Sequence, residues 1–70
     1  MMPLSLATIN EDYRIVKINY TENKKQHLND LGFIEGSKVK VLSSNMNGLI
    51  VLIKDARIAI SKEVAMHIMV

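Results

Sequence analysis

Residues 38–60 read KVKVLSSNMNGLIVLIKDARIAI and carry the clearest structural pattern in the chain. Residues 38–41 alternate polar and apolar side chains, which is typical of a strand with one buried face. Residues 49–53 are wholly apolar and rich in β-branched side chains, so we expect a central strand there. Residues 57–60 follow a tight turn at residues 54–56 and form the next expected strand. This stretch therefore predicts three consecutive strands.

Upstream of these strands lies the only good helix candidate, at residues 22–31. Thr21 suits the N-cap position, because its hydroxyl can accept a bond from a free backbone N–H of the first turn. Gly32 suits the left-handed position that ends a helix. Leu28 and Leu31, together with the neighbouring histidine, share one face by helical spacing and predict the side that docks on the strands.

Shorter elements at both ends complete the predicted order. Residues 13–19 are expected to form the first strand and residues 67–70 the last one. Residues 61–65 resemble a single helical or 3₁₀ turn, with Ser61 as its cap. Residues 3–9 alternate only loosely between apolar and polar side chains.

Five short strands and one helix in 70 residues predict a mainly β protein. An open sheet of this size would leave one face and two edges bare, whereas a bent sheet that closes on itself covers them. We therefore expect a small SH3-like β-barrel of about five strands, with one short α-helix and a 3₁₀ turn before the last strand. The length fits a single domain, assigned here to residues 1–70.

The composition narrows the class of protein. Apolar residues make up 49% and charged residues 23%, as in ordinary globular proteins, and the formal net charge is only +2. There is no cysteine, which removes disulfides and thiolate chemistry and fits a reducing cytoplasm. No secretory signal is visible, and the longest apolar run is far too short to span a bilayer. We therefore expect a cytoplasmic protein.

No pattern in the sequence indicates catalysis. No serine stands in a Gly-x-Ser-x-Gly motif, and no nucleophile is paired with a histidine. His27 is expected on the helix at the core boundary, and His67 is expected to be exposed on the last strand. Imidazole and carboxylate ligands from these two histidines with Asp30, Glu35 or Glu63 would suit iron, zinc or manganese, but their spacing matches no known metal motif. We expect no catalytic residue and no cofactor, with weak Fe or Zn binding left open.

Two groups of side chains remain unexplained by the predicted core. Lys24 and Lys25 are adjacent on the helix, and Lys38 and Lys40 share one face of their strand. Phosphate binding would need such residues to converge, and a solvated face is the simpler alternative. Met46 lies in the polar connection 43–48 with no apolar neighbour in sequence. It either offers an adaptable contact surface or folds back over the barrel mouth.

The run KQHLNDLGFIEGSKVKV at residues 25–41 resembles the signature of the ferrous iron transport protein A (FeoA) family. In that family a helix ends in Leu-x-x-Leu-Gly, followed by an apolar residue, a glycine two or three positions on and an alternating strand. The apolar-Ala-apolar segment at residues 58–60, with Ala65 and Ile68 after it, is similar to the family's C-terminal half. The likeness covers nearly the whole chain.

The resemblance implies a cytoplasmic SH3-like barrel that supports ferrous iron uptake and has no catalytic activity firmly attached to it. The family works with FeoB, a membrane transporter for ferrous iron with a cytosolic GTP-binding domain. The same domain type forms the C-terminal part of iron-dependent repressors. Residues 46–49 read MNGL where the family often carries Leu-Gly-Asp-Pro, which affects any partner contact through that loop. Residues 10–12 lack a glycine that the family often has.

We expect the helix and the 43–48 connection to carry the contact with the FeoB-type transporter. The candidate contact residues are Lys24, Lys25, His27, Leu28, Met46 and Asn47.

Two other functions stay open. One is a nucleic-acid-binding SH3-like module, although no nucleic acid is the expected partner. The other is a regulator of partner GTP hydrolysis, in which Arg14 or Arg57 would act as an arginine finger, although both lie on predicted strands. Homo-oligomerisation also stays open.

Overall fold

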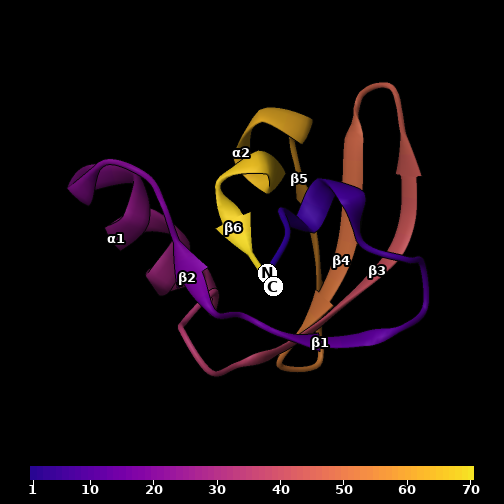
Figure 1. Cartoon of the computed structure of the whole chain (residues 1–70), viewed down its shortest axis with the longest axis horizontal. Coiled ribbons are helices and arrows are strands. Elements are labelled where there is room, and N and C mark those ends of the chain that lie inside the picture. The colour runs from indigo at the N-terminus through magenta and orange to yellow at the C-terminus, as the bar shows by residue number, and fades with distance from the viewer.

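The computed structural model describes the whole chain, Met1 to Val70, and places six strands in two antiparallel sheets (Figure 1). A four-stranded sheet has the order β1-β3-β4-β5, and a separate two-stranded ribbon joins β2 and β6. The strands are β1 (Asp12–Arg14), β2 (Lys17–Ile18), β3 (Lys38–Asn45), β4 (Gly48–Ile53), β5 (Ala56–Ile60) and β6 (Ile68–Met69). The helical elements are η1 (Leu4–Leu6), α1 (Glu22–Leu31) and α2 (Lys62–Met66). The mainly β fold expected from the sequence is confirmed.

The central meander β3-β4-β5 forms where the sequence predicts it, but all three strands are longer than predicted. β3 continues to Asn45 and β4 begins at Gly48, so most of the predicted polar connection is strand, and Met46 and Asn47 alone make the turn. β4 also has one exposed face. Val51 is fully buried whereas Ile50 is 38% exposed, because no second layer covers the outer side of the sheet.

The turn between β4 and β5 consists of Lys54 and Asp55, one residue shorter than predicted. Both residues have positive φ, at 47° and 66°. This is the pattern of a type I′ turn, whose twist matches that of the flanking strands. The turn therefore pins the register in which Ile53 pairs with Ala56.

The predicted first strand, residues 13–19, is wrong as a single element. β1 pairs with β3, and β2 pairs with β6, so the chain changes sheets at Ile15 and Val16. The Ile15 amide donates to the Ser37 carbonyl at 2.9 Å, and the Val16 amide donates to the Met69 carbonyl at 2.8 Å. A corner of this kind allows a short chain to wrap its strands around a core. Because it divides one predicted strand into two, the protein has six strands where five were expected.

The sheet bends toward a barrel without closing. Met2 and Val70 exchange two backbone hydrogen bonds, at 2.8 and 2.7 Å, and Pro3 bridges to Met69, so the N-terminal segment covers the outer edge of β6. β5 pairs only with β4. The expected closed cylinder is therefore an SH3-like barrel that stays open on the outer side of β5.

Both α-helices begin at predicted caps. Thr21 Oγ1 accepts from the Lys24 amide at 3.4 Å, and Ser61 Oγ accepts from the Val64 amide at 3.1 Å. Gly32 ends α1 in the left-handed conformation at φ 107°, as expected. The element before the last strand is a five-residue α-helix, and the 3₁₀ turn lies at the N-terminus instead, at η1.

One hydrophobic cluster fills the interior, and it leaves no buried side-chain polar atom without a partner. α1 contributes Leu28 to it, whereas Leu31 is 39% exposed, so the predicted apolar face of the helix is only partly buried. No helix is long and apolar enough to cross a membrane. The buried residues are Leu4, Ile15, Ile18, Leu28, Phe33, Val39, Val41, Leu49, Val51, Ile53, Ile60, Ala65 and Ile68.

Gly48 allows a close backbone approach between β4 and the end of β5, which generates a test. Its φ is +150°, and a Cβ there would lie 2.3 Å from the Ile60 carbonyl oxygen. We expect Gly48→Ala to lower the free energy of unfolding by about 1–3 kcal/mol, because it adds a backbone clash to an unfavourable φ. Urea denaturation followed by circular dichroism measures this loss.

The control variant is Gly36→Ala. Gly36 also has a positive φ, +90°, but a Cβ there meets no atom within 4 Å. Its loss should therefore be smaller. Equal losses in the two variants would show that the contact with Ile60 does not limit the residue at position 48.

Candidate partner-docking site

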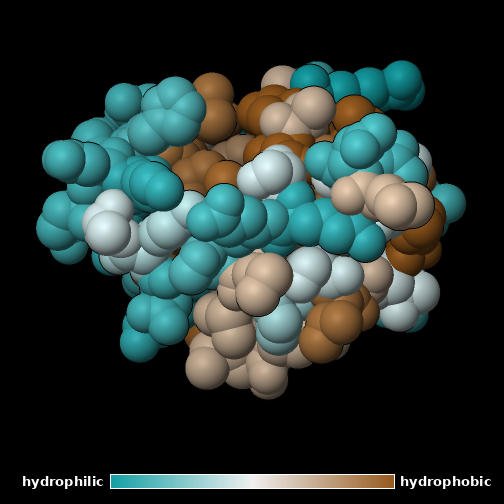
Figure 2. Space-filling view, turned by 90° about the horizontal axis from the view of Figure 1, so that it is seen from above, coloured by the Kyte–Doolittle hydropathy of each residue, from teal (hydrophilic) through white to brown (hydrophobic).

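A groove of about 330 Å³ lies between α1 and the start of α2. Tyr20 and residues of α1 line one side of it, and Glu63 and Val64 of α2 line the other. Figure 2 shows the molecule from above, with hydrophilic side chains on the left, which is the side of α1. Hydrophobic surface is exposed between these side chains and the rest of the molecule. The groove is lined by Tyr20, Asn23, Lys24, His27, Leu28, Glu63 and Val64.

Tyr20 anchors an ordered arrangement of side chains at this groove. Its ring stacks on the His67 ring, with centroids 4.0 Å apart and an interplanar angle of 16°. Lys24 Nζ lies 4.7 Å from the centroid of the Tyr20 ring and donates to the Tyr20 hydroxyl at 3.2 Å. The cation is thereby held by both a cation–π contact and a hydrogen bond. The side chain of Lys24 is oriented although it is exposed.

His67 occupies a different place from the one predicted. It ends α2 and is half-buried, rather than exposed on the last strand. Its Nδ1 lies 2.9 Å from the Asn19 carbonyl oxygen. Because a carbonyl oxygen can only accept, Nδ1 carries the proton and donates it. The hydrogen bond and the stack on Tyr20 give His67 a structural role that tertiary packing alone creates.

The pKa of Lys24 is raised above its ordinary value of 10.5. The hydrogen bond to Tyr20 is the largest cause, followed by the negative charge of Tyr20 when it ionises, while partial desolvation acts in the opposite direction. Glu63 across the groove adds a smaller attraction. Lys24 therefore remains a cation at every physiological pH.

The other predicted contact residues on α1 are placed unequally. His27 is exposed on the groove wall, although it was expected at the core boundary. Lys25 is half-buried and its Nζ lies 3.9 Å from the Glu35 carboxylate, so the two neighbouring lysines do not form a free basic patch. Leu28 is only 4% exposed and belongs to the core, so it supports the groove from below.

The β3-β4 hairpin tip carries the remaining predicted contact residues. Met46 is 94% exposed, which decides between the two alternatives left open: it projects into solvent and does not fold back over the barrel. The Asn47 amide donates to Asn45 Oδ1 at 2.8 Å, which rigidifies the turn. Figure 1 places this tip and α1 at opposite ends of the molecule. The five candidate residues that reach the surface therefore lie in two separate regions, and Leu28 lies in the core.

The fold does not assemble the metal ligands considered from the sequence. His27 and Glu63 both line the groove, but no group of three or more histidine, aspartate or glutamate side chains is placed to hold a metal ion. Asp30 accepts from Gln26 along α1, and Glu35 pairs with Lys25.

The two arginines lie on strands of the four-stranded sheet, as predicted. Arg14 on β1 donates to the Gly36 carbonyl at 2.8 Å, which ties its guanidinium to its own chain and disfavours a role as an arginine finger. Arg57 on β5 is exposed. Reasoning from sequence missed that both share a face with Lys38 and Lys40, because only the strand register aligns them.

The Tyr20 hydroxyl is the main cause of the raised Lys24 pKa, so removing it should lower that pKa. We expect Tyr20→Phe to produce a clear decrease, measured by NMR titration of the Lys24 side-chain resonances. Glu63→Gln is the matched control and should produce a smaller decrease, because Glu63 contributes least. A larger effect from Glu63→Gln would contradict the hydrogen bond as the dominant cause.

Nearly the whole chain is similar to one known protein family. Residues 2–70 match the model of the FeoA domain family. A protein of Methanocaldococcus jannaschii named "Putative Fe(2+) transport protein A" is 36% identical over 70 residues, covering 100% of this chain and 85% of that protein.

Solved structures agree with this match. A crystal structure described as Iron Uptake Regulatory Protein (FeoA) is 30% identical, with a TM-score of 0.87, and the likeness covers 96% of this chain and 89% of that one. FeoA of Stenotrophomonas maltophilia, solved with zinc and described as a procaryotic SH3 domain protein, is 20% identical with a TM-score of 0.84 over 99% and 88% of the chains.

A further neighbour shares the fold as part of a longer chain. IdeR of T. acidophilum is 26% identical with a TM-score of 0.85, and the likeness covers 96% of this chain but 32% of that protein. The model match over nearly every residue, the curated relative and the shared SH3-like fold lead to one conclusion. The chain belongs to the FeoA family of iron-transport accessory proteins.

Proposed function

We propose that this chain is a cytoplasmic accessory protein of ferrous iron uptake, which binds the cytosolic GTP-binding region of a FeoB-type membrane transporter and supports Fe(II) transport. Membership of the FeoA family supports the link to iron transport. The observation that carries the docking proposal is the oriented cation of Lys24, held over Tyr20 at the rim of the α1–α2 groove.

The groove has the composition of a small protein-binding site. Leu28 and Val64 supply apolar lining, while Lys24 and Glu63 supply charges of opposite sign at its rim. Protein interfaces combine an apolar centre, which excludes water, with a polar rim that sets orientation. Lys24 costs little to immobilise on binding, because Tyr20 already orients it.

The hairpin tip offers a second contact of a different kind. Met46 is the most exposed large apolar side chain of the protein. Methionine is unbranched and polarisable, so it adapts to an irregular apolar surface. We assign it to the same transporter, at a point on its cytosolic region well separated from the one that meets α1.

The groove contact is tested with the double variant Lys24→Glu, Lys25→Glu in a pull-down of the transporter's cytosolic GTP-binding region. We expect at least about tenfold weaker binding, because the rim cation of Lys24 is reversed and then repels the surface that it attracts, while the change at Lys25 replaces an ion pair with Glu35 by two like charges. The control is Lys17→Glu, Lys38→Glu, which makes the same charge change at two exposed positions away from the groove. Equal binding by both double variants would refute the groove contact.

The tip contact is tested separately with Met46→Ser. Because the side chain is 94% exposed, the melting temperature should stay essentially unchanged. Binding to the same cytosolic region should weaken several-fold, since an adaptable apolar contact is lost. Titration calorimetry measures both this variant and the wild type, and unchanged affinity would remove the tip from the proposed interface.

A further inference from the structure

β5 is an edge strand, and the backbone groups on the side that faces away from β4 are free. The type I′ turn makes Ile53 and Ala56 a hydrogen-bonded pair, so Ala56, Ile58 and Ile60 turn their backbone groups toward β4. By the same alternation, the amides and carbonyls of Arg57 and Ala59 point away from the sheet. No hydrogen bond outside the regular elements involves either residue.

Nothing in the fold covers this edge. Arg57 and Ala59 are both exposed, and the N-terminal segment that might have paired with β5 pairs with β6 instead. Proteins usually blunt an edge strand with proline, a bulge or inward-pointing charges, because free backbone groups attract other strands. The sequence of β5, ARIAI, has no proline, and the only register irregularity in the sheet lies between Val41 and Ser43.

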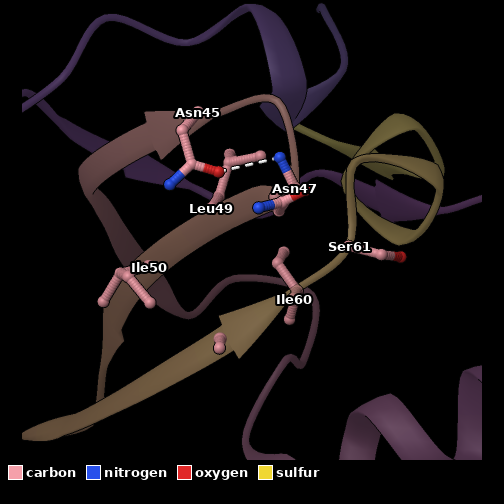
Figure 3. Close-up of a pocket in the computed structure, with 8 residues that line it drawn as sticks. Asn45, Asn47, Leu49, Ile50, Ile60 and Ser61 are labelled. Carbon is pink, nitrogen blue, oxygen red and sulfur yellow. Dashed lines mark hydrogen bonds between the residues drawn. The ribbon is translucent and has the colours of Figure 1, made fainter.

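A pocket continues from the end of this edge. It has a volume of about 310 Å³ and lies at the end of β5, next to the tip of the β3-β4 hairpin (Figure 3). Ile50, Ala59 and Ile60 form its apolar wall, and the side-chain amides of Asn45 and Asn47 lie on the side of the tip. A strand laid along β5 would therefore bring one of its side chains to a pocket with an apolar wall and polar rim.

The outer face of the sheet beside β5 is basic. Val39 and Val41 are buried, so Lys38 and Lys40 face outward, and the register aligns Arg14 with Lys38 and Lys40 with Leu52. Leu52 in turn pairs with Arg57, which puts that arginine on the same face at the edge.

Two carboxylates lie among the cations of this face, Asp12 and, in the β4–β5 turn, Asp55, which line one pocket with Lys38, Lys40 and Lys54. Asp12 is the acidic residue on β1 and lies 3.5 Å from Lys40. Arg14 stands directly opposite Lys38, a like-charge pair that destabilises a sheet. The arrangement leaves an excess of positive charge next to the open edge, which a negatively charged ligand would neutralise.

We propose that β5 binds an extended acidic segment of another protein as an added strand. Its backbone bonds the free amides and carbonyls of Arg57 and Ala59. Side chains on one face of the added strand are acidic and meet Arg57 and the basic sheet face. An apolar side chain enters the pocket beside Ile60. This is strand addition, in which the backbone supplies affinity and alternate side chains supply specificity.

A protein segment fits this surface better than a second copy or a nucleic acid. Pairing of two β5 strands would join two basic faces in one sheet, which like charges oppose. Single-stranded nucleic acid needs exposed aromatic rings for stacking. Phe33 is buried, Tyr20 is stacked on His67, and the Tyr13 hydroxyl is engaged by Thr8 and Glu11.

The test uses a capped eight-residue peptide that alternates valine and glutamate, added to the full chain and followed by two-dimensional NMR. We expect shifts centred on the Arg57 and Ala59 amides and slower hydrogen exchange at both. Two matched peptides are the controls. One has lysine in place of glutamate, and the other is N-methylated at each amide that faces β5. Both should bind at least about tenfold more weakly.

Two variants test the same contact from the protein side. Ala59→Pro removes an outward amide, a change that an edge strand tolerates because β4 does not use that amide. It should weaken binding of the acidic peptide about tenfold, whereas Ala59→Thr should not. Arg57→Glu should reverse the preference toward the lysine peptide. If Ala59→Pro fails to fold, the N-methylated peptide decides the question with the wild type.

Four results would overturn the proposal. The first is that the amide resonances of Arg57 and Ala59 do not shift at millimolar acidic peptide, and the second is that the N-methylated peptide binds as tightly as the acidic one. The third is that the free protein is already a dimer paired through β5. The fourth is that an RNA oligonucleotide displaces the peptide from β5. The inference goes beyond the transporter docking proposed above and does not depend on it. The Lys24→Glu, Lys25→Glu variant should bind the peptide normally, so failure of one proposal leaves the other intact.

Discussion

The register of β4 between its two neighbours is the constraint on which the rest of the protein depends. Side chains of a strand alternate between faces, so a slip of one residue would exchange Val51 and Ile53 for Ile50 and Leu52 in the core. The type I′ turn pins the register with β5. On the other side, a shift between Val41 and Ser43 accommodates an extra residue on β3.

The same register creates the surfaces on which function is proposed. When the inner faces of β3 and β4 fill the core, Lys38, Lys40 and Arg57 are forced onto the outer face. The hairpin tip then projects with Met46 exposed, and Gly48 lies against the Ile60 carbonyl, where any Cβ would clash. Core packing and surface charge in so small a protein are therefore two results of one pairing.

The interior leaves little room for anything except packing. Its buried side chains are all apolar, and one cluster of oriented polar side chains, Lys24, Tyr20 and His67, lies at the surface near α1 and α2. An accessory role in iron transport agrees with this division, because such a protein acts through what its surface contacts. The groove and the β5 edge differ in mechanism, since the first offers side chains and the second offers backbone.

The sequence by itself determined the elements whose signals are local. Thr21 and Gly32 mark both ends of α1, Ser61 marks the start of α2, and alternation marks the central strands. Caps and periodicity depend on neighbours within a few residues, so they are visible before folding. The glycine and leucine pattern at residues 25–41 was also enough to indicate the family.

Tertiary structure alone decided the features that join distant segments. The chain changes sheets at Ile15, His67 stacks on Tyr20, α1 and the hairpin tip lie at opposite ends, and β5 keeps an open edge. Each depends on which strands pair and in what register. Pairing is chosen by the total burial of apolar surface over the whole chain, and no short stretch of sequence carries that information.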